Sequence, residues 1–219
     1  MDVAAQVGNL DILAFFWRHY PVACSPRAFV LAAQKGDLNV VKWLYEHYPE
    51  QLHPDTLAHA AGMGHLAIVQ STCACNPVTQ WLTGLNVPTT SDAMDWAASC
   101  GHLAVVGWLH DHRQEGCTIR AMDYAATGEH IDVVQWLHNN RHEGCTTQAM
   151  DGAAGSGHSD VVVFLHEHRH EGATVDAMDG AAAGGHIAMV QWLHANHLEG
   201  CSRAAMDRAA GTGNLEIVR

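Results

Sequence analysis

The sequence contains little charge and no run of basic residues. Only 16% of its 219 residues are Asp, Glu, Lys or Arg, and acidic residues outnumber basic ones by 23 to 11, which gives a formal net charge of -12 with histidine neutral. Nucleic-acid phosphates and anionic lipids repel such a chain, so neither is an expected partner. The sequence also lacks an apolar stretch long enough for a membrane span and an N-terminal signal-peptide pattern. We therefore expect an intracellular protein of the cytoplasm or nucleus.

Signatures of catalysis and of disulfide scaffolds are missing as well. The chain has no phosphate-binding glycine loop, no nucleophile elbow and no dinucleotide-binding fingerprint. Its seven cysteines are an odd number without the spacing of a small secreted domain, so we interpret them as reduced thiols. We predict that the protein is not an enzyme and carries no cofactor.

What the sequence has in abundance is internal repetition. Ala-Met-Asp recurs every 28 residues from Ala93 to Ala205, and an aromatic-Leu-His triplet and a Glu-Gly pair recur in the same register. Ala-Ala pairs extend this period into the N-terminal third of the chain. Residues 1–219 are therefore predicted to form one repeat array with a truncated last repeat. The eight repeats begin at Met1, Phe29, Leu57, Met94, Met122, Met150, Met178 and Met206.

Residues 71–80 interrupt the third repeat. Deleting them restores a regular helical pattern, and the helix interior does not tolerate Pro77, so we predict a loop here. Two interpretations stay open, a functional insertion and an error of the gene model. Because neither end of the chain carries a polar capping repeat, which arrays need for solubility, we expect this chain to be a piece of a longer array.

Each repeat has the pattern of two helices. A hydroxyl side chain such as Thr118 precedes the Ala-Met-Asp segment and suits an N-cap, and a glycine such as Gly157 suits the C-cap. The second segment, for example from His102 to about Arg113, is apolar on two stripes, as expected of a helix between two neighbours. No segment alternates like a strand. The pattern predicts an all-α solenoid.

The segment from Ala121 to His138 resembles the ankyrin repeat, as do Ala97-Ala98 and the Gly-His-Leu-Ala-Val-Val segment that begins at Gly101. The period is 28 rather than about 33 residues, and the missing residues fall where ankyrin repeats carry a β-hairpin finger. The resemblance thus implies an ankyrin-like α-solenoid with little or no β-hairpin. It also implies a non-enzymatic scaffold that binds a protein partner.

The first helix of each repeat carries the predicted binding face. Three of its positions, spaced i, i+4 and i+7, form a stripe whose chemistry differs between repeats while the scaffold residues hardly change. Trp96 and Tyr124 share one of these positions and are typical hot-spot residues, whereas the alternative is that both rings pack between first helices. The predicted partner-binding residues are Asp92, Trp96, Arg120, Tyr124, Thr127, Gln148, Asp176 and Arg208.

Four other ladders receive structural interpretations. The aspartates of Ala-Met-Asp lie a full repeat apart, too far for paired catalysis, and are interpreted as an inter-repeat hydrogen-bond ladder: Asp95, Asp123, Asp151, Asp179 and Asp207. The second helix opens with a histidine in five repeats and with Asn or Asp in the others, so these histidines are predicted N-caps: His65, His102, His130, His158 and His186. A later histidine position is predicted to pack: His110, His138, His166 and His194. One cysteine position is predicted to be buried and inert: Cys24, Cys117, Cys145 and Cys201.

Two alternatives to protein binding stay open. His138 with His142, and His166 with His170, have the i, i+4 spacing that forms half of a helical zinc motif. A metal-binding protein is therefore one alternative, although no residue is assigned to a metal site. The other alternative is an inert structural segment of a larger multidomain protein.

Overall fold

The computed structural model describes residues 1–20, 24–72, 90–196, 198 and 200–214. Within these residues it contains fifteen α-helices and one short 3-10 helix (Pro49–Gln51), and no strand. The predicted all-α class is therefore confirmed, and no β-hairpin joins successive repeats in the described part of the chain. No helix among the described residues has the length and apolar character needed to cross a bilayer.

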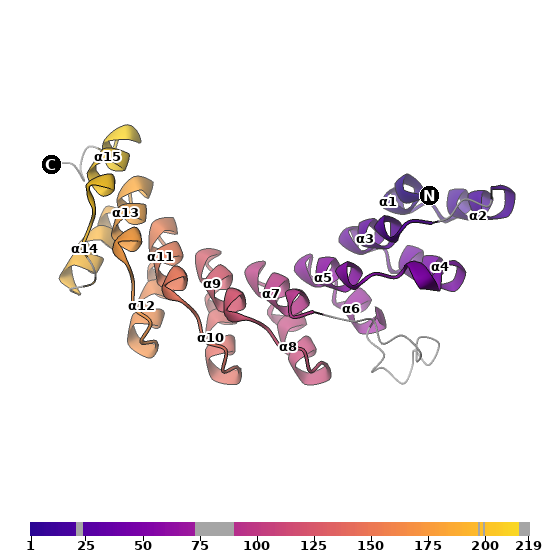
Figure 1. Cartoon of the computed structure of the whole chain (residues 1–219), viewed down its shortest axis with the longest axis horizontal. Coiled ribbons are helices and arrows are strands. Elements are labelled where there is room, and N and C mark those ends of the chain that lie inside the picture. The colour runs from indigo at the N-terminus through magenta and orange to yellow at the C-terminus, as the bar shows by residue number, and fades with distance from the viewer. Residues whose placement is uncertain (21–23, 73–89, 197, 199, 215–219) are drawn as a thin grey trace. The chain divides into compact units, whose positions relative to one another are not determined.

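Two helices follow each other in each of the first seven repeats, and the described residues of the eighth contain its first helix (Figure 1). The first helices are α1 (Asp2–Val7), α3 (Pro26–Lys35), α5 (Pro54–Gly62), α7 (Asp92–Ser99), α9 (Ile119–Thr127), α11 (Thr147–Ser156), α13 (Val175–Gly184) and α15 (Arg203–Gly211). The second helices are α2 (Leu10–His19), α4 (Leu38–His47), α6 (Leu66–Thr72), α8 (Leu103–His112), α10 (Ile131–Asn140), α12 (Ser159–His168) and α14 (Ile187–Ala195).

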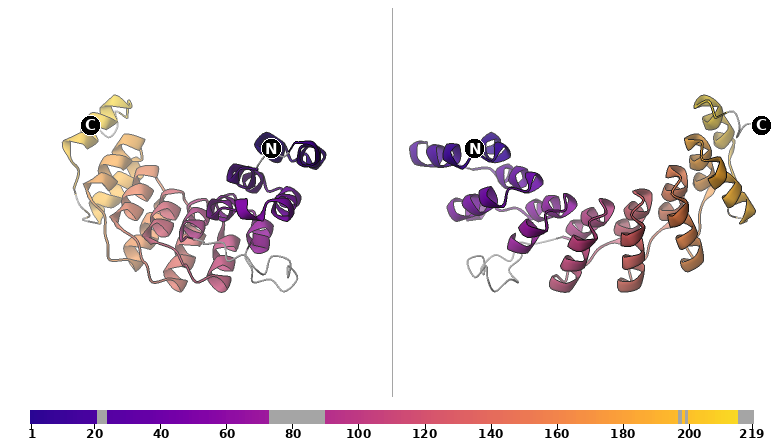
Figure 2. Two further views of the ribbon diagram at one scale, coloured as in Figure 1. Left: turned by 45° about the vertical axis from the view of Figure 1, so that its right-hand side comes forward. Right: turned by 180° about the vertical axis from the view of Figure 1, so that it is seen from behind.

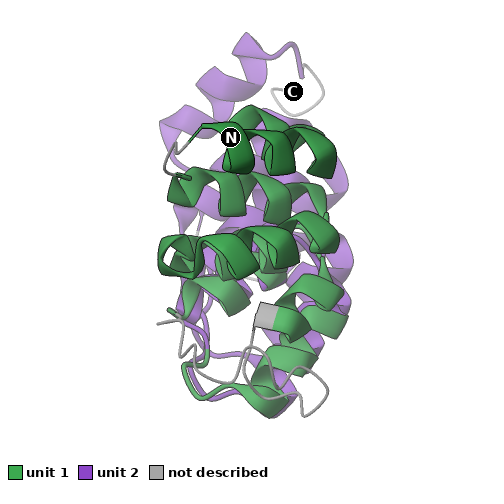
Figure 3. Cartoon of the chain, turned by 90° about the vertical axis from the view of Figure 1, so that its right-hand side faces the viewer, with its two compact units in different colours: residues 1–97, 104–116 green, residues 98–103, 117–219 purple. Residues whose placement is uncertain are grey.

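The chain divides into two compact units, residues 1–97 with 104–116 and residues 98–103 with 117–219 (Figure 3). In the first unit α1, α3 and α5 pack side by side, and in the second unit α9, α11, α13 and α15 do the same. Within each unit the second helices form a separate layer along one side of the first helices, as two further views show (Figure 2). Each unit is thus a two-layer stack of helix pairs.

Short polar side chains start the first helices and left-handed residues end them. Thr146 and Thr174 each accept the backbone N–H of the residue two positions later, so the predicted hydroxyl caps are confirmed there. Gly157 ends α11 at a φ of 82°, where its N–H binds the carbonyls of Ala153 and Ala154. In the fifth repeat the left-handed residue is Glu129, at a φ of 65°. A side chain at such an angle is strained.

The core consists of small residues from the first helices and branched residues from the second. In the fifth repeat Ala125, Ala126, Val133, Val134 and Leu137 are all buried. Alanines and glycines let neighbouring first helices approach closely, as α11 and α13 do. A Cβ built on Gly180 would lie 3.0 Å from the Cα of Gly155.

The predicted insertion at residues 71–80 begins inside a helix. α6 continues to Thr72, and the buried Ser71 hydroxyl donates to the carbonyls of Ala67 and Ile68 at 2.7 and 3.1 Å. Residues 71 and 72 of the predicted loop are therefore helical, and its residues 73–80 lie outside the described residues, as do residues 215–219 of the last repeat.

Candidate interaction surface

The eight residues predicted to bind a partner are all exposed on first helices. Trp96 is 42% exposed and Tyr124 is 50% exposed, which leaves half of each ring in contact with the protein. On α9 the side chains of Arg120, Tyr124 and Thr127 lie on one helix face because they are spaced i, i+4 and i+7. The remaining members are Asp92 on α7, Gln148 on α11, Asp176 on α13 and Arg208 on α15.

In the first unit, Trp96 lies in a row of polar and aromatic side chains with His59 and Gln34, neither of which is a predicted binding residue. The indole packs edge-on against His59, with ring centroids 4.9 Å apart. His59 in turn lies 3.2 Å from the amide nitrogen of Gln34, measured at its Nδ1. His59 holds the same repeat position as Trp96 once the insertion is allowed for. Alignment of the repeats could therefore have identified His59 from the sequence.

In the second unit, part of the i, i+4, i+7 stripe packs between neighbouring first helices. A Cβ on Gly152 would clash with the hydroxyl of Thr127, which itself donates to the carbonyl of Asp123 at 2.9 Å. A Cβ on Gly180 would also be tight, 3.0 Å from the Cα of Gly155, whereas a Cβ on Gly155 would lie at an ordinary contact distance of 3.6 Å from Gly180. The close approach of the helices therefore accounts for the small residues at Gly152 and Gly180.

The predicted aspartate ladder is confirmed in the second unit. Asp123 accepts the Thr146 N–H and hydroxyl, each at 2.8 Å, and Asp151 accepts the same two groups of Thr174 at 2.7 and 2.8 Å. Asp179 binds the N–H of Ser202 at 2.8 Å and also its hydroxyl. Each carboxylate therefore fixes the start of the next first helix. This rigid connection holds the exposed face of neighbouring repeats in register.

The histidines at the start of the second helices do not act as predicted. Asn9 and Asp37 do cap their helices, but His130, His158 and His186 make no side-chain cap bond. Instead the Nε2 of His158 lies 3.1 Å from the carbonyl oxygen of Thr127, in the preceding repeat. The carboxamide of Asn214, at the same repeat position, likewise reaches the carbonyl oxygens of Ala182 and Ala183 in the preceding repeat, at 3.4 and 3.2 Å. In this position histidine connects repeats.

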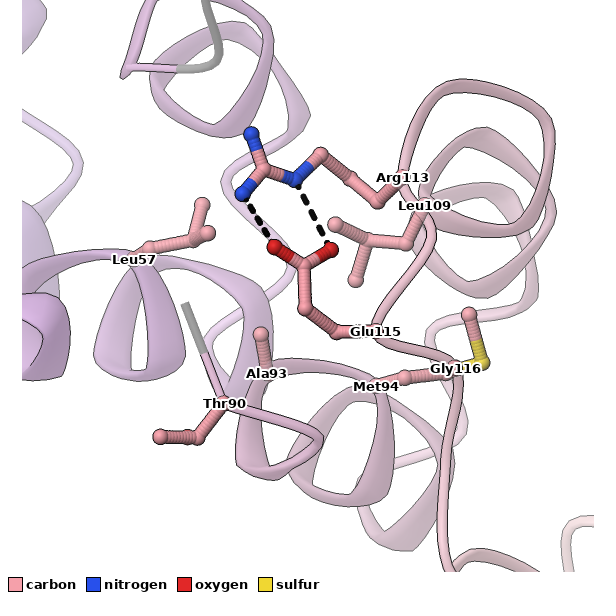
Figure 4. A pocket seen from close by; sticks show the side chains of 8 residues that line it. All are labelled: Leu57, Thr90, Ala93, Met94, Leu109, Arg113, Glu115 and Gly116. Carbon is pink, nitrogen blue, oxygen red and sulfur yellow. Dashed lines mark hydrogen bonds and ion pairs between the residues drawn. The ribbon is translucent and has the colours of Figure 1, made fainter. Parts of the chain in front are cut away.

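A ladder of arginine–glutamate pairs takes the place of the finger. Arg113 and Glu115 are 2.5 Å apart at Nη2 and Oε1 and line a small pocket with Leu57, Met94 and other residues (Figure 4). The same pairs recur 28 residues apart: Arg141–Glu143 and Arg169–Glu171. The glutamates were recognised from the Glu-Gly period, but the arginines two residues before three of them were missed.

The ion pairs shift the pKa values of their own side chains. Arg169 also interacts with Cys145, a member of the repeated cysteine position. Burial alone would raise the pKa of Glu171, but hydrogen bonds from Arg169 and from backbone N–H groups outweigh it and lower the pKa to about 2. Burial raises the pKa of Cys24 and of Cys145 to about 11, so these thiols are inert as predicted. The predicted burial is confirmed for Cys24 and Cys117, whereas Cys145 is only partly buried and Cys201 is exposed.

The predicted packing is confirmed for His138 and for His166, whose ring lies edge-on to Trp192, whereas His194 is exposed. The i, i+4 histidine pairs do not form. His138 lies edge-on against Phe164 at 5.6 Å, and burial lowers its pKa. The helix α10 ends at Asn140 because Arg141 is extended, so His142 does not share a helix face with His138. α12 likewise ends at His168, which leaves His170 outside it. The described residues hold no group of three or more potential ligands that could bind a metal ion.

Comparisons with known proteins agree with this geometry. Residues 94–138 match the family model of ankyrin repeats in many copies. The fold is similar to that of the crystal structure of the human ASB11 ankyrin repeat domain, with a TM-score of 0.56 and 18% sequence identity over 87% of this chain and 97% of that one. Among curated protein sequences none matches this chain.

Proposed function

We propose that this chain, whose residues 94–138 match the ankyrin-repeat model and whose fold is similar to that of an ankyrin repeat domain, is a non-enzymatic scaffold that binds a protein partner along the exposed face of its first helices. Ankyrin repeats are generally protein-interaction modules, and repeat arrays bind along extended surfaces. The observation that carries the proposal is the exposure of large aromatic and charged side chains on helices whose other faces are alanine-rich and buried.

The geometry of α9 illustrates how this face would hold a partner. Arg120 and Tyr124 are one helical turn apart, and both point away from the buried Ala121 and Ala125. Tyrosine and arginine supply much of the binding energy of protein interfaces, on the order of 2 kcal/mol or more for each hot-spot residue. The aspartate ladder beneath them keeps the backbone fixed, so little ordering entropy opposes binding.

We also propose that the scaffold acts inside the cell. The five cysteines in the described part of the chain are free thiols. Thiols persist in the reducing cytoplasm and nucleus, whereas secreted proteins usually pair them.

A capture experiment with matched variants tests the proposed face. The wild-type array and the Tyr124→Ala and Arg120→Glu variants are used as bait in an extract of cells that express the protein. The matched control is Tyr20→Ala, because Tyr20 is as exposed as Tyr124, at 51%, but lies beside α2 rather than on a first helix. We expect the first two variants to lose the partner and the control to keep it.

The same variants separate a binding role from a packing role. Unfolding is measured for each bait, because loss of a buried aromatic costs about 3–5 kcal/mol. If Tyr124→Ala loses that much stability while its folded fraction still captures the partner, the ring is a packing residue and the proposed face is wrong.

A further inference from the structure

The second helices of the second unit present a surface that partner binding by the first helices does not use. α10, α12 and α14 are described in full and contain no Lys or Arg, while Asp132, Asp160 and Glu167 are exposed on them. A groove opens on this surface beside α12. Its lining includes Gln135 from α10 and, from α12, Asp160, Val163, Phe164, Glu167 and His168.

The floor of this groove is apolar and held in place. The Phe164 ring is stacked on His168, with centroids 4.4 Å apart and planes 19° apart, and His138 meets it edge-on. His168 is itself fixed through its Nδ1, which lies 3.0 Å from the Phe164 carbonyl oxygen. The aromatic floor is therefore preorganised, and a ligand would not have to order it.

Val163 makes this repeat different from its neighbours. The preceding and following repeats have Gln135 and Gln191 at the same position. Here the repeat places a partly exposed valine beside Phe164 instead of an amide. The groove is consequently more apolar than the corresponding surface of α10 or α14.

Two carboxylates stand at the ends of this apolar floor. Asp160, Val163, Phe164 and Glu167 are spaced i, i+3, i+4 and i+7, so they lie on one face of α12. Seven residues of helix rise by about 10 Å, which separates Asp160 from Glu167 by about two turns. The nearest basic side chain in the sequence, Arg169, is already paired with Glu171.

We propose that this face of α12 docks a positively charged amphipathic helix of a protein ligand, with two basic residues about two turns apart and apolar side chains between them. The apolar side chains would contact Val163 and Phe164, and the basic groups would reach Asp160 and Glu167. Charge complementarity selects this occupant because α10 and α12, the helices that line the groove, offer carboxylates and contain no competing Lys or Arg. The surface is separate from the first-helix face and does not depend on it.

A designed peptide tests the proposal with the whole chain. The probe is a labelled, alanine-based helical peptide of about fifteen residues with two arginines seven positions apart and leucines at the third and fourth positions after the first arginine. Its binding is followed by fluorescence anisotropy. We expect saturable binding that weakens as NaCl rises, because partly exposed ion pairs are screened.

Three variants locate the bound peptide. Asp160→Asn and Glu167→Gln should each weaken binding up to about fivefold, as expected for an exposed ion pair. Val163→Gln should weaken it by a similar factor, and it should fold because Gln occupies this position in the two neighbouring repeats. The matched control is Asp132→Asn, which removes the equivalent carboxylate from α10 outside the groove and should leave the affinity unchanged.

Several results would overturn the proposal. One is the absence of saturable binding by the folded wild-type chain. Another is an equal loss of affinity in Asp132→Asn and Asp160→Asn, which would mean that general negative charge holds the peptide. A third is an unchanged affinity in Val163→Gln, or tight binding of a control peptide whose leucines are replaced by alanines.

Discussion

Removal of the Asp123 carboxylate should destabilise the array strongly. Its side chain is 3% exposed and accepts both the N–H and the hydroxyl of Thr146 at 2.8 Å. Hydrogen bonds to a charged group contribute about 1.5–3 kcal/mol each. Thr146 is only half-buried, so water can replace part of what it loses, and the variant no longer buries a charge. We therefore expect Asp123→Ala to lower the free energy of unfolding by about 2–4 kcal/mol.

A double-mutant cycle isolates the hydrogen bonds from other effects of the substitution. Thr146→Val removes the hydroxyl but keeps the backbone N–H, and the two single variants are compared with the double variant by urea unfolding. The expected coupling energy is about 1–2 kcal/mol. Glu167→Ala, at an exposed position, should stay within about 0.5 kcal/mol of the wild type. The ladder would be refuted as a source of stability by a coupling energy near zero together with an Asp123→Ala variant whose free energy of unfolding is as high as that of Glu167→Ala.

Other consequences of the structure can be measured separately. Glu129→Gly should raise the free energy of unfolding by about 1 kcal/mol, because glycine adopts a positive φ without strain, and a lower melting temperature would contradict this. Iodoacetamide at pH 8 should modify Cys201 well before Cys145, whose pKa is about 11, and equal rates by peptide mass spectrometry would show that Cys145 is accessible. Glu171 has a folded pKa of about 2 against an ordinary value of 4.5, so its stabilisation is present above pH 4.5 and lost as the pH falls through 2. Glu171→Gln should therefore be less stable than the wild type at pH 7 but nearly equal to it at pH 2, and a difference that does not change with pH would argue against the ion pair.

The repeat period made much of the fold predictable. Because each position recurs, the chain itself shows which side chains a position accepts, and this revealed the helix pairs, the hydroxyl caps and the aspartate ladder. The same comparison explains where the ladder is interrupted. In the second repeat Val30 replaces the aspartate, and His53 stands where the hydroxyl partner would be.

Contacts between repeats were the hardest feature to predict, because the sequence does not give the distance between repeats. His158 shares its position with Asn and Asp, so capping was a fair prediction, but only the spacing of the repeats shows that its ring reaches Thr127. The close approach of Gly180 to Gly155, between α13 and α11, is likewise visible only in three dimensions. The pairing of His138 with His142 failed differently. No proline or glycine marks the end of α10, and the extended Arg141 became visible only in three dimensions.

The most direct test of the proposed function is site-specific photo-crosslinking. A benzophenone amino acid is placed either at Tyr124 on α9 or at the exposed Gln191 on α14, and the captured partner is analysed for covalent adducts. If the first-helix face binds the partner, adducts form from position 124 and not from position 191. Adducts from position 191 alone, with both proteins folded and both still capturing the partner, would contradict the proposal.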